Sequence, residues 1–158
     1  MNITIDVAKP EDFDAVNSIV KEGQDLHAEA LPYIFRKVDP VMPRSYFKEL
    51  LESQDAEIFV AKINHEIVGF AIMDIKVSPP FDSMTPRKYA YMSDFGVSSN
   101  VQKTGIGSAL FDACVEWSKT VGASDLELNV WEFNEKAISF YEKKGMKNLS
   151  RKMNLVLK

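Results

Sequence analysis

Gln102-Lys103-Thr104-Gly105-Ile106-Gly107-Ser108 is the stretch of this chain that decides its fold. It lies between an extended apolar run over residues 89–97 and a run over residues 110–121 whose apolar positions recur every three or four residues. These patterns predict a strand, a turn and an amphipathic helix. A turn of small residues at such a junction presents backbone N–H groups and the positive end of the helix dipole. We therefore expect it to bind a phosphate or pyrophosphate, with Lys103 adding a positive charge.

The turn differs from the two commoner phosphate-binding loops. The chain has no Gly-x-x-x-x-Gly-Lys-Ser/Thr run, and Leu110 stands where a dinucleotide-binding fingerprint requires a third glycine. Both differences argue against an unrelated nucleotide-binding protein. Taken alone, Gly105 and Gly107 are equally well explained as residues that only ease a tight turn.

A second motif follows in the last third of the chain. Residues 124–130 alternate as a strand does, and Asn134 is a suitable cap for a helix over residues 135–144 that Gly145 would end. With both motifs in this order, the chain resembles the GNAT family of acetyl-CoA-dependent N-acetyltransferases. The matching residues are Gln102, Gly105 and Gly107 in the first motif, and Asn134, Ala137, Phe140, Tyr141 and Gly145 in the second. Met146 replaces the usual phenylalanine and keeps the apolar character.

The resemblance implies one N-acetyltransferase domain over residues 1–158, with an α/β (mixed α+β) fold. Its twisted, mostly antiparallel sheet would have six to seven strands flanked by about four helices, and would be splayed at the acetyl-CoA site. The pantetheine arm would lie against the strand that ends at Val97, and the pyrophosphate against the turn. The implied cofactor-binding residues are Phe95, Gly96, Val97, Gln102, Lys103, Thr104, Gly105, Ile106, Gly107, Ser108, Asn134 and Tyr141.

Two residues are candidates for proton transfer. By resemblance, the Tyr141 hydroxyl lies near the thioester sulfur and acts as the general acid, although its spacing also suits a core aromatic. Asp94 is the candidate general base, directly or through a water, and a hydrogen-bonded structural carboxylate is the alternative. Strand alternation predicts that Asp94 shares a face with Ala90, Met92 and Gly96. Further candidates are Glu132 and Asn129 as bases, and His27 in the lining of the acceptor pocket.

The net charge and the residue composition limit which binding partners and cellular locations we expect. The 158 residues carry a net charge of −4, which argues against broad binding of nucleic acid or membrane surfaces. The N-terminus begins as a strand and no run is long enough to span a bilayer, so we expect a cytoplasmic protein. A single cysteine, Cys114, lies on the apolar face of its helix, which predicts a buried structural thiol. With two histidines far apart, a metal site is not expected.

The predicted function is acetyl transfer from acetyl-CoA to a primary amine of a small molecule or a protein, by direct attack and without an acyl-enzyme. The alternative is a non-catalytic acyl-CoA-binding or sensing module. The resemblance also suggests a homodimer, and the acceptor amine is not specified by any motif.

The remaining segments complete the predicted order of elements. The pattern predicts a helix that opens at Pro10 and an irregular stretch over residues 26–35. Further predictions are a helix over residues 44–51, a strand hairpin over residues 58–73, a proline-rich loop over residues 78–86, and one or two final strands within residues 146–157.

Overall fold

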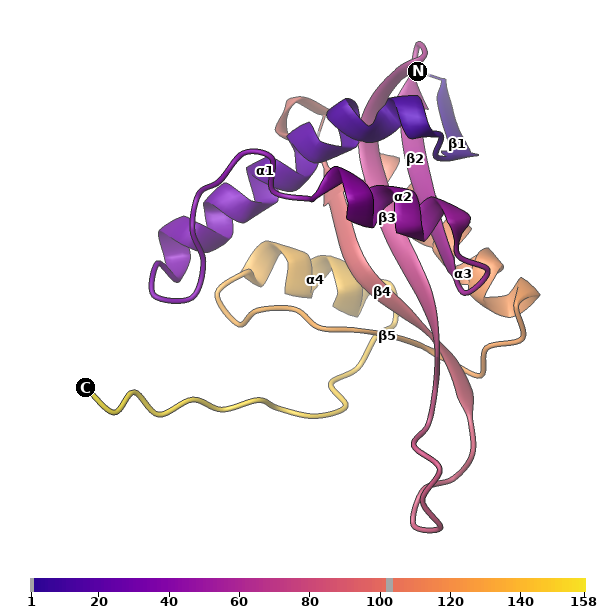
Figure 1. Cartoon of the computed structure of the whole chain (residues 1–158), viewed down its shortest axis with the longest axis vertical. Helices are drawn as coiled ribbons and strands as arrows, with labels where there is room; N and C mark the ends of the chain where they lie inside the picture. The colour runs from indigo at the N-terminus through magenta and orange to yellow at the C-terminus, as the bar shows by residue number, and fades with distance from the viewer. Residues whose placement is uncertain (1, 102–103) are drawn as a thin grey trace. The chain divides into compact units, whose positions relative to one another are not determined.

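The structure is a computed structural model that describes residues 2–101 and 104–158. The chain forms two compact units, the first ending at Leu128 and the second beginning at Asn129, and each is described by itself. Among the described residues, the first unit contains one sheet and three α-helices, and the second contains one α-helix (Figure 1). The single domain expected from the sequence stays a prediction.

The sheet of the first unit has the strand order β1-β2-β3-β4-β5. The first three pairings are antiparallel and the last, between β4 and β5, is parallel. The predicted α/β fold with a mostly antiparallel sheet is confirmed, but the described part of the chain contains five strands and not the expected six to seven. These strands are β1 (Ile3–Val7), β2 (Ala56–Ile63), β3 (Glu66–Val77), β4 (Lys88–Val97) and β5 (Leu126–Leu128).

Helices cover both faces of this sheet. Figure 1 shows α1 (Phe13–Ala30) and α2 (Arg44–Glu52) crossing one face and α3 (Ile106–Thr120) lying behind the other. We call the first the α1/α2 face and the second the α3 face. The core of the α1/α2 face includes Phe13, Val16, Ile19, Phe47, Leu50, Ile58, Val60, Phe70 and Ile72. No helix in the described ranges combines the length and the hydropathy needed to cross a membrane.

Two details of α1 differ from the prediction. Residues Pro10–Asp12 form a 3-10 turn, in which the Lys9 N–H donates to the Asp12 carboxylate at 2.8 Å, and the α-helix begins only at Phe13. The helix then continues to Ala30, so the irregular stretch expected over residues 26–35 is wrong for its first half. Pro32 explains the actual end, because a proline disfavours helical geometry in the residue before it.

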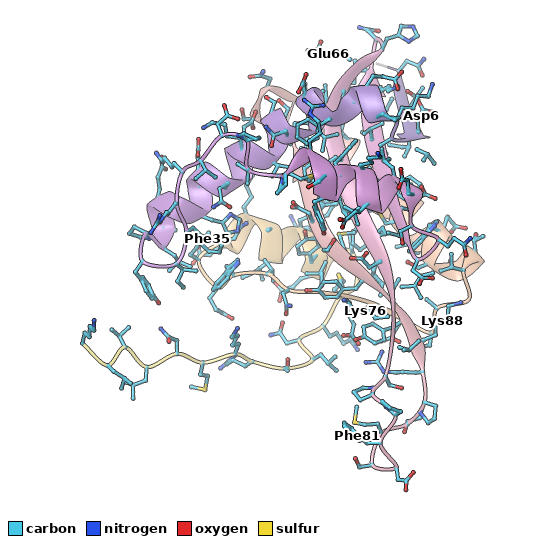
Figure 2. All side chains as sticks on the ribbon, in the orientation of Figure 1. Asp6, Phe35, Glu66, Lys76, Phe81 and Lys88 are labelled. Carbon is cyan, nitrogen blue, oxygen red and sulfur yellow. The ribbon has the colours of Figure 1, made fainter. Side chains whose placement is uncertain are left out.

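The predicted hairpin over residues 58–73 is confirmed, and the sheet contains a second hairpin between β3 and β4. Asn64 and His65 form the β2–β3 turn with positive φ angles of 51° and 69°. The β3–β4 hairpin is longer, and the predicted loop over residues 78–86 connects its strands. Figure 2 shows Phe81 at the outer end of this hairpin, where its side chain is exposed.

A β-bulge at Ser93 overturns the predicted alternation along β4. Met92 pairs with Met73 and Asp94 pairs with Ile72, so Ser93 is an extra residue on β4. Directly paired residues point to the same face of a sheet, and Ile72 belongs to the core of the α1/α2 face. Asp94 therefore faces α1 and α2, on the side opposite to Met92. The expectation that Asp94 shares a face with Ala90 and Met92 is wrong, whereas Asp94 and Gly96 do share one.

The second unit is built around α4 (Glu135–Lys143). The Asn134 side chain accepts a hydrogen bond from the Ala137 N–H at 3.2 Å, and Gly145 follows the helix with a φ of 96°, so the predicted cap and stop are confirmed. The final strands expected within residues 146–157 are wrong. That segment has no regular structure, and the second unit contains no strand with which it could pair.

Candidate active site

The C-terminal half of β4 extends past its parallel neighbour. The β4–β5 ladder begins with Ala90 opposite Leu126 and ends with Met92 opposite Leu128. β4 then continues through the bulge to Val97, still paired with β3. The predicted contacts of Phe95, Gly96 and Val97 with pantetheine lie on this extension, and they stay predictions.

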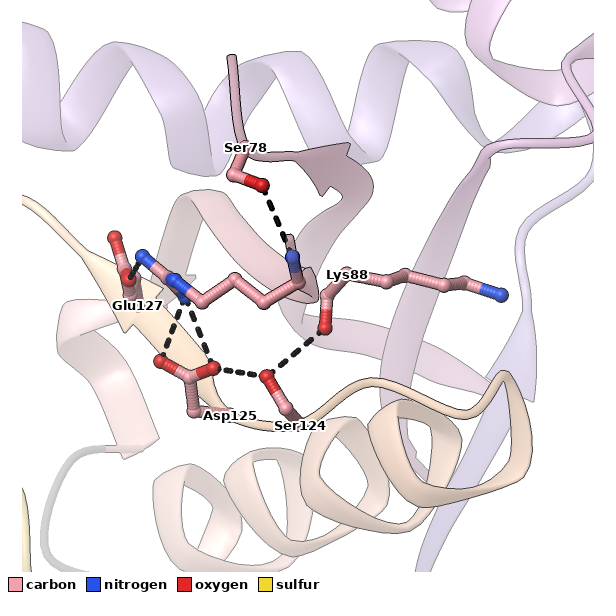
Figure 3. A network of polar contacts seen from close by, with 6 residues as sticks. Ser78, Lys88, Ser124, Asp125 and Glu127 are labelled. Atoms are coloured by element: carbon pink, nitrogen blue, oxygen red, sulfur yellow. Dashed lines mark hydrogen bonds and ion pairs between the residues drawn. The ribbon is translucent and has the colours of Figure 1, made fainter. Parts of the chain in front are cut away.

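A polar network fixes the start of the β4–β5 ladder (Figure 3). The Arg87 guanidinium donates to both carboxylate oxygens of Asp125 at 3.0 Å and to Glu127 at 2.6 Å. These contacts raise the pKa of Arg87, the hydrogen bond to Glu127 contributing most. The Ser124 hydroxyl also donates to the Lys88 carbonyl at 3.1 Å. Charged groups therefore hold the start of the ladder, which ends at Met92 and Leu128.

The predicted anion-binding turn leads into α3. Gly105 is the N-cap residue, with a φ of 87° that suits glycine, and among the described residues no side chain caps this helix end. A Cβ at this position would meet nothing within 4 Å, and the first turn of α3 has no acidic residue. The N–H groups of such a turn have no acceptor within the helix, so they can receive an anion. Gln102 and Lys103 lie outside the described residues.

The remaining residues of the turn contribute in two ways. Ile106 is buried, so only its backbone can contact a ligand, while Gly107 and Ser108 are half-buried in the same helical turn. The Thr104 hydroxyl donates to the Val101 carbonyl and so steadies the approach to the helix. All four positions are compatible with their predicted role, which stays a prediction.

Close packing joins this turn to the end of β4. A Cβ on Gly69 of β3 would lie 3.2 Å from the Gly96 carbonyl and 3.4 Å from the Ile106 side chain. Gly96 itself faces α1, where a Cβ would lie 2.9 Å from the Phe70 ring and 3.2 Å from Ile19. The glycines therefore allow the extension of β4, the sheet and the start of α3 to approach one another closely.

Asp94 is the titratable group of the β4 extension. Burial raises the pKa of its carboxyl to about 6, against the opposing effects of a hydrogen bond and of His27. The hydrogen bond comes from the Phe95 N–H, which donates to Asp94 Oδ1 at 2.9 Å. A carboxyl with this pKa is ionised at neutral pH and still basic enough to accept a proton, as a general base requires.

Residues from α1 and α2 surround Asp94 on the α1/α2 face. His27, in the last turn of α1, donates from Nδ1 to the Gly23 carbonyl at 2.6 Å and packs edge-on against Phe35, with ring centroids 5.1 Å apart. On α2, burial and then the carboxylates of Asp74, Asp94 and Glu49 raise the pKa of Tyr46. His27 was a candidate from the sequence, whereas Tyr46 and Asp74 were missed. The sequence did contain a signal for Asp74, because it is a single acidic residue directly after the apolar run of residues 67–73.

The second unit carries the other two predicted residues. Asn134 uses its side-chain oxygen to cap α4, and its additional contact with pantetheine stays a prediction. Tyr141 is half-buried on α4, with its ring centroid 5.5 Å from that of Phe140. The candidate bases Asn129 and Glu132 precede this helix.

Comparisons with known proteins decide the family. A model of the acetyltransferase (GNAT) family matches residues 23–146. The chain belongs to the GNAT acetyltransferase family. The resemblance seen in the sequence is thereby confirmed, and so is the enzyme class of an N-acetyltransferase.

Individual relatives agree with this assignment. An uncharacterised N-acetyltransferase of Methanocaldococcus jannaschii, MJ1207, is 31% identical over 102 residues, which cover 65% of this chain and 44% of that protein. The chain thus spans less than half the length of this relative. An N-alpha-acetyltransferase of Sulfurisphaera tokodaii is 30% identical over 137 residues, covering 85% of this chain and 75% of that protein. The crystal structure of a tetramutant of the BH1408 protein from Bacillus halodurans has a TM-score of 0.94 at 27% identity, covering 98% and 99% of the two chains.

Two further groups bear on the chemistry of this GNAT protein. Cys114 is a free, fully buried cysteine on α3, and burial raises the pKa of its thiol to about 12. It therefore has negligible thiolate at neutral pH. No group of three or more potential metal ligands occurs in the part of the chain that the structure describes, and the expected absence of a metal stays a prediction.

Proposed function

We propose that this GNAT protein transfers the acetyl group of acetyl-CoA to a primary amine, by direct attack of the amine within a ternary complex. The observation that carries the proposal is the environment of Asp94. Its carboxyl has a pKa of about 6 and lies on the α1/α2 face of the sheet. The residue belongs to the extension of β4 that packs near the start of α3. A general base on the strand that leads into an anion-binding turn is an arrangement that this reaction can use.

The start of α3 fits the pyrophosphate of acetyl-CoA. An uncapped helix end with a glycine at the N-cap leaves room for a bulky anion, and the helix dipole favours negative charge there. We assign Thr104, Gly105, Ile106, Gly107 and Ser108 to this contact, mainly through their backbone N–H groups.

Asp94 would act on the acceptor amine. An alkylammonium must lose a proton before its nitrogen can attack the acetyl carbonyl, and the Asp94 carboxylate accepts that proton directly or through a water. As the new C–N bond forms, the C–S bond breaks and its electron pair stays on the sulfur of coenzyme A. The products are the acetamide and coenzyme A, once the nitrogen has released its second proton to solvent and the thiolate has taken up a proton.

We assign that last proton to the Tyr141 hydroxyl, on the basis of its position in the family motif. Attack is direct because the single cysteine of the chain, Cys114, is buried as a neutral thiol. The chain therefore offers no thiolate for an acyl-enzyme.

The test is release of free coenzyme A from acetyl-CoA in the presence of a panel of primary amines, with mass spectrometry of the acetylated product. Tyr141→Phe should lower kcat about 10- to 100-fold with little effect on acetyl-CoA affinity, because general-acid catalysis contributes at least this much. Phe140→Leu, a change to the neighbouring ring without loss of a hydroxyl, is the matched control and should leave kcat nearly unchanged.

Thermal unfolding separates this function from its alternatives. Acetyl-CoA at a hundredfold excess over its Kd should stabilise the protein by about 2.7 kcal/mol, whereas ATP and NAD should not. Stabilisation by acetyl-CoA without turnover of any amine would favour the non-catalytic acyl-CoA-binding module. Equal stabilisation by ATP would contradict both.

A further inference from the structure

Asp74 is a carboxylate on β3 that the proposed chemistry does not use. It is half-buried and lies opposite Tyr91 of β4, on the α1/α2 face. Within residues 2–101 and 104–158, its side chain makes neither a hydrogen bond nor an ion pair. A half-buried carboxylate without a partner loses hydration and gains nothing in return, which is unfavourable unless a cation binds there.

The cations close to Asp74 are engaged elsewhere. Lys76, labelled in Figure 2, shares the face and lies with its ammonium 5.3 Å from the centroid of the Tyr91 ring. Arg87 is held by Asp125 and Glu127, and its guanidinium also lies 4.2 Å from the centroid of the Tyr89 ring. Asp74 therefore faces the candidate site without a basic partner from its own sheet.

The position of Asp74 relative to Asp94 is fixed by the strand register. Asp94 is opposite Ile72, and Asp74 is two residues further along β3, so the two acids are diagonal neighbours on one face. Such neighbours are about 7–8 Å apart. Both carboxylates interact with the Tyr46 phenol on α2, which agrees with this placement. Glu49 adds a third carboxylate near Tyr46, and His27 interacts with Asp94 from the α1 side.

We propose that Asp74 is a specificity-determining residue, which binds a second positive charge of the acceptor while Asp94 serves the amine that reacts. This inference rests on the proposed function and names its substrate class: a linear diamine or polyamine with nitrogen atoms separated by about the distance between diagonal strand neighbours. Tyr46 adds an aromatic ring and a hydroxyl to the same binding surface, and aromatic rings attract alkylammonium groups.

The experiment compares two amines that differ only in the second charge. Putrescine and n-butylamine have the same alkyl chain, and the quantity measured is the ratio of kcat/KM for putrescine to kcat/KM for n-butylamine. A charge-assisted contact at a half-buried site should make this ratio at least about tenfold in the wild-type protein. Asp74→Asn should bring the ratio down about tenfold, and Asp74→Glu should restore part of it.

The control is Asp82→Asn on the exposed β3–β4 loop, which changes the net charge equally and should keep the wild-type ratio. Thermal unfolding of each variant shows that it is folded. A ratio near one in the wild-type protein, or an unchanged ratio in Asp74→Asn, would overturn the inference while the acetyltransferase function stands. Failure of both amines and of every other amine to be acetylated would instead overturn the proposed function.

Discussion

The two halves of β4 differ in what holds them and in what they carry. Residues 88–92 pair with β3, and residues 90–92 also pair with β5. Ala90 and Met92 are buried, and the Arg87 network lies at the start of this half. Residues 93–97 follow the bulge, extend past β5, and carry Asp94 and the close-packed Gly96. The first half stabilises the fold, and the second carries the proposed general base, Asp94.

One extra residue makes this difference. Without the bulge, alternation would place Asp94 on the α3 face with Met92, within the apolar packing of that helix. Ser93 shifts the alternation by one position and turns Asp94 toward α1 and α2, where His27, Tyr46 and Asp74 lie. Bulges next to active sites commonly redirect a side chain in this way.

The strongest test of the contrast between the halves is Asp94→Asn. The amide keeps the size of the carboxyl and cannot accept the proton of the amine, so kcat should fall about 10²- to 10⁴-fold. Met92→Leu, on the other side of the bulge, is the control and should change kcat less than threefold or so because apolar swaps of similar volume are tolerated. Steady-state kinetics would contradict the assignment if Asp94→Asn kept most of the wild-type kcat.

The pH dependence of stability tests the burial of Asp94. The pKa is about 6 in the folded protein against an ordinary value of 3.8, so the folded state holds the proton more tightly than the unfolded state does. Asp94 therefore lowers the free energy of unfolding as the pH rises from about 4 to 7, by up to about 3 kcal/mol. Below about pH 4 the carboxyl is protonated in both states and the effect vanishes.

Urea unfolding of the wild type and Asp94→Asn across this pH range measures the difference. Asp94→Asn should become progressively more stable than the wild type as the pH increases. The kcat/KM of the wild type should fall as the pH drops below about 6, because the base becomes protonated. A stability difference that stays constant with pH would mean that Asp94 is not desolvated.

Gly96→Ala tests the packing of the second half of β4. The new Cβ would lie 2.9 Å from the ring of Phe70, which is itself fully buried, so the ring or the backbone must shift to admit it. We expect a loss of about 1–3 kcal/mol in the free energy of unfolding, the usual range for overpacking.

Gly23→Ala is the matched control, since a Cβ in that position of α1 meets nothing within 4 Å. It should stabilise the protein by about 0.5–1 kcal/mol, because alanine is the better helix former. The double variant Gly96→Ala with Phe70→Leu should recover part of the loss. If Gly96→Ala alone were as stable as the wild type, close packing would not explain the glycine.

Local signals allowed much of this arrangement to be predicted from the sequence. The turn at Gly105 and the cap at Asn134 each depend on residues within a few positions of one another, and both follow from helix-terminus chemistry. The β2–β3 hairpin is similarly local, because its turn at Asn64 and His65 joins two adjacent apolar runs. The sequence also singled out Asp94 as an acid within an apolar strand, but the predicted face of the sheet for this residue was wrong.

Features that depend on residues far apart in the sequence could not be predicted in the same way. Nothing in the residues around Ser93 marks a bulge, because the two-versus-one pairing depends on the partner strand. Tyr46 and Asp74 come together only because α2 packs against β2, the strand paired with β3, and the sequence does not show which strand a helix will cover. The apolar pattern of residues 146–157 suits a strand, but a strand also needs a neighbour, which the pattern cannot supply.

The smallest expected effect concerns the Arg87 network that closes the first half of β4. Arg87→Met keeps an apolar stem over Tyr89 and removes the contacts with Asp125 and Glu127, leaving those two carboxylates without their counter-ion. Because exposed ion pairs contribute little and are screened by salt, the unfolding midpoint should fall by only a few degrees, less at high ionic strength.

Lys119→Met, which breaks an exposed pair with Glu116 within α3, is the comparison and should have a still smaller effect. Since the network lies at the far end of the ladder from Asp94, kcat should stay within about twofold of the wild type, as expected for independent sites. A large loss of kcat with an unchanged midpoint would mean that the two halves of β4 are coupled, and that the network sets the position of the catalytic extension as well as the stability of the ladder.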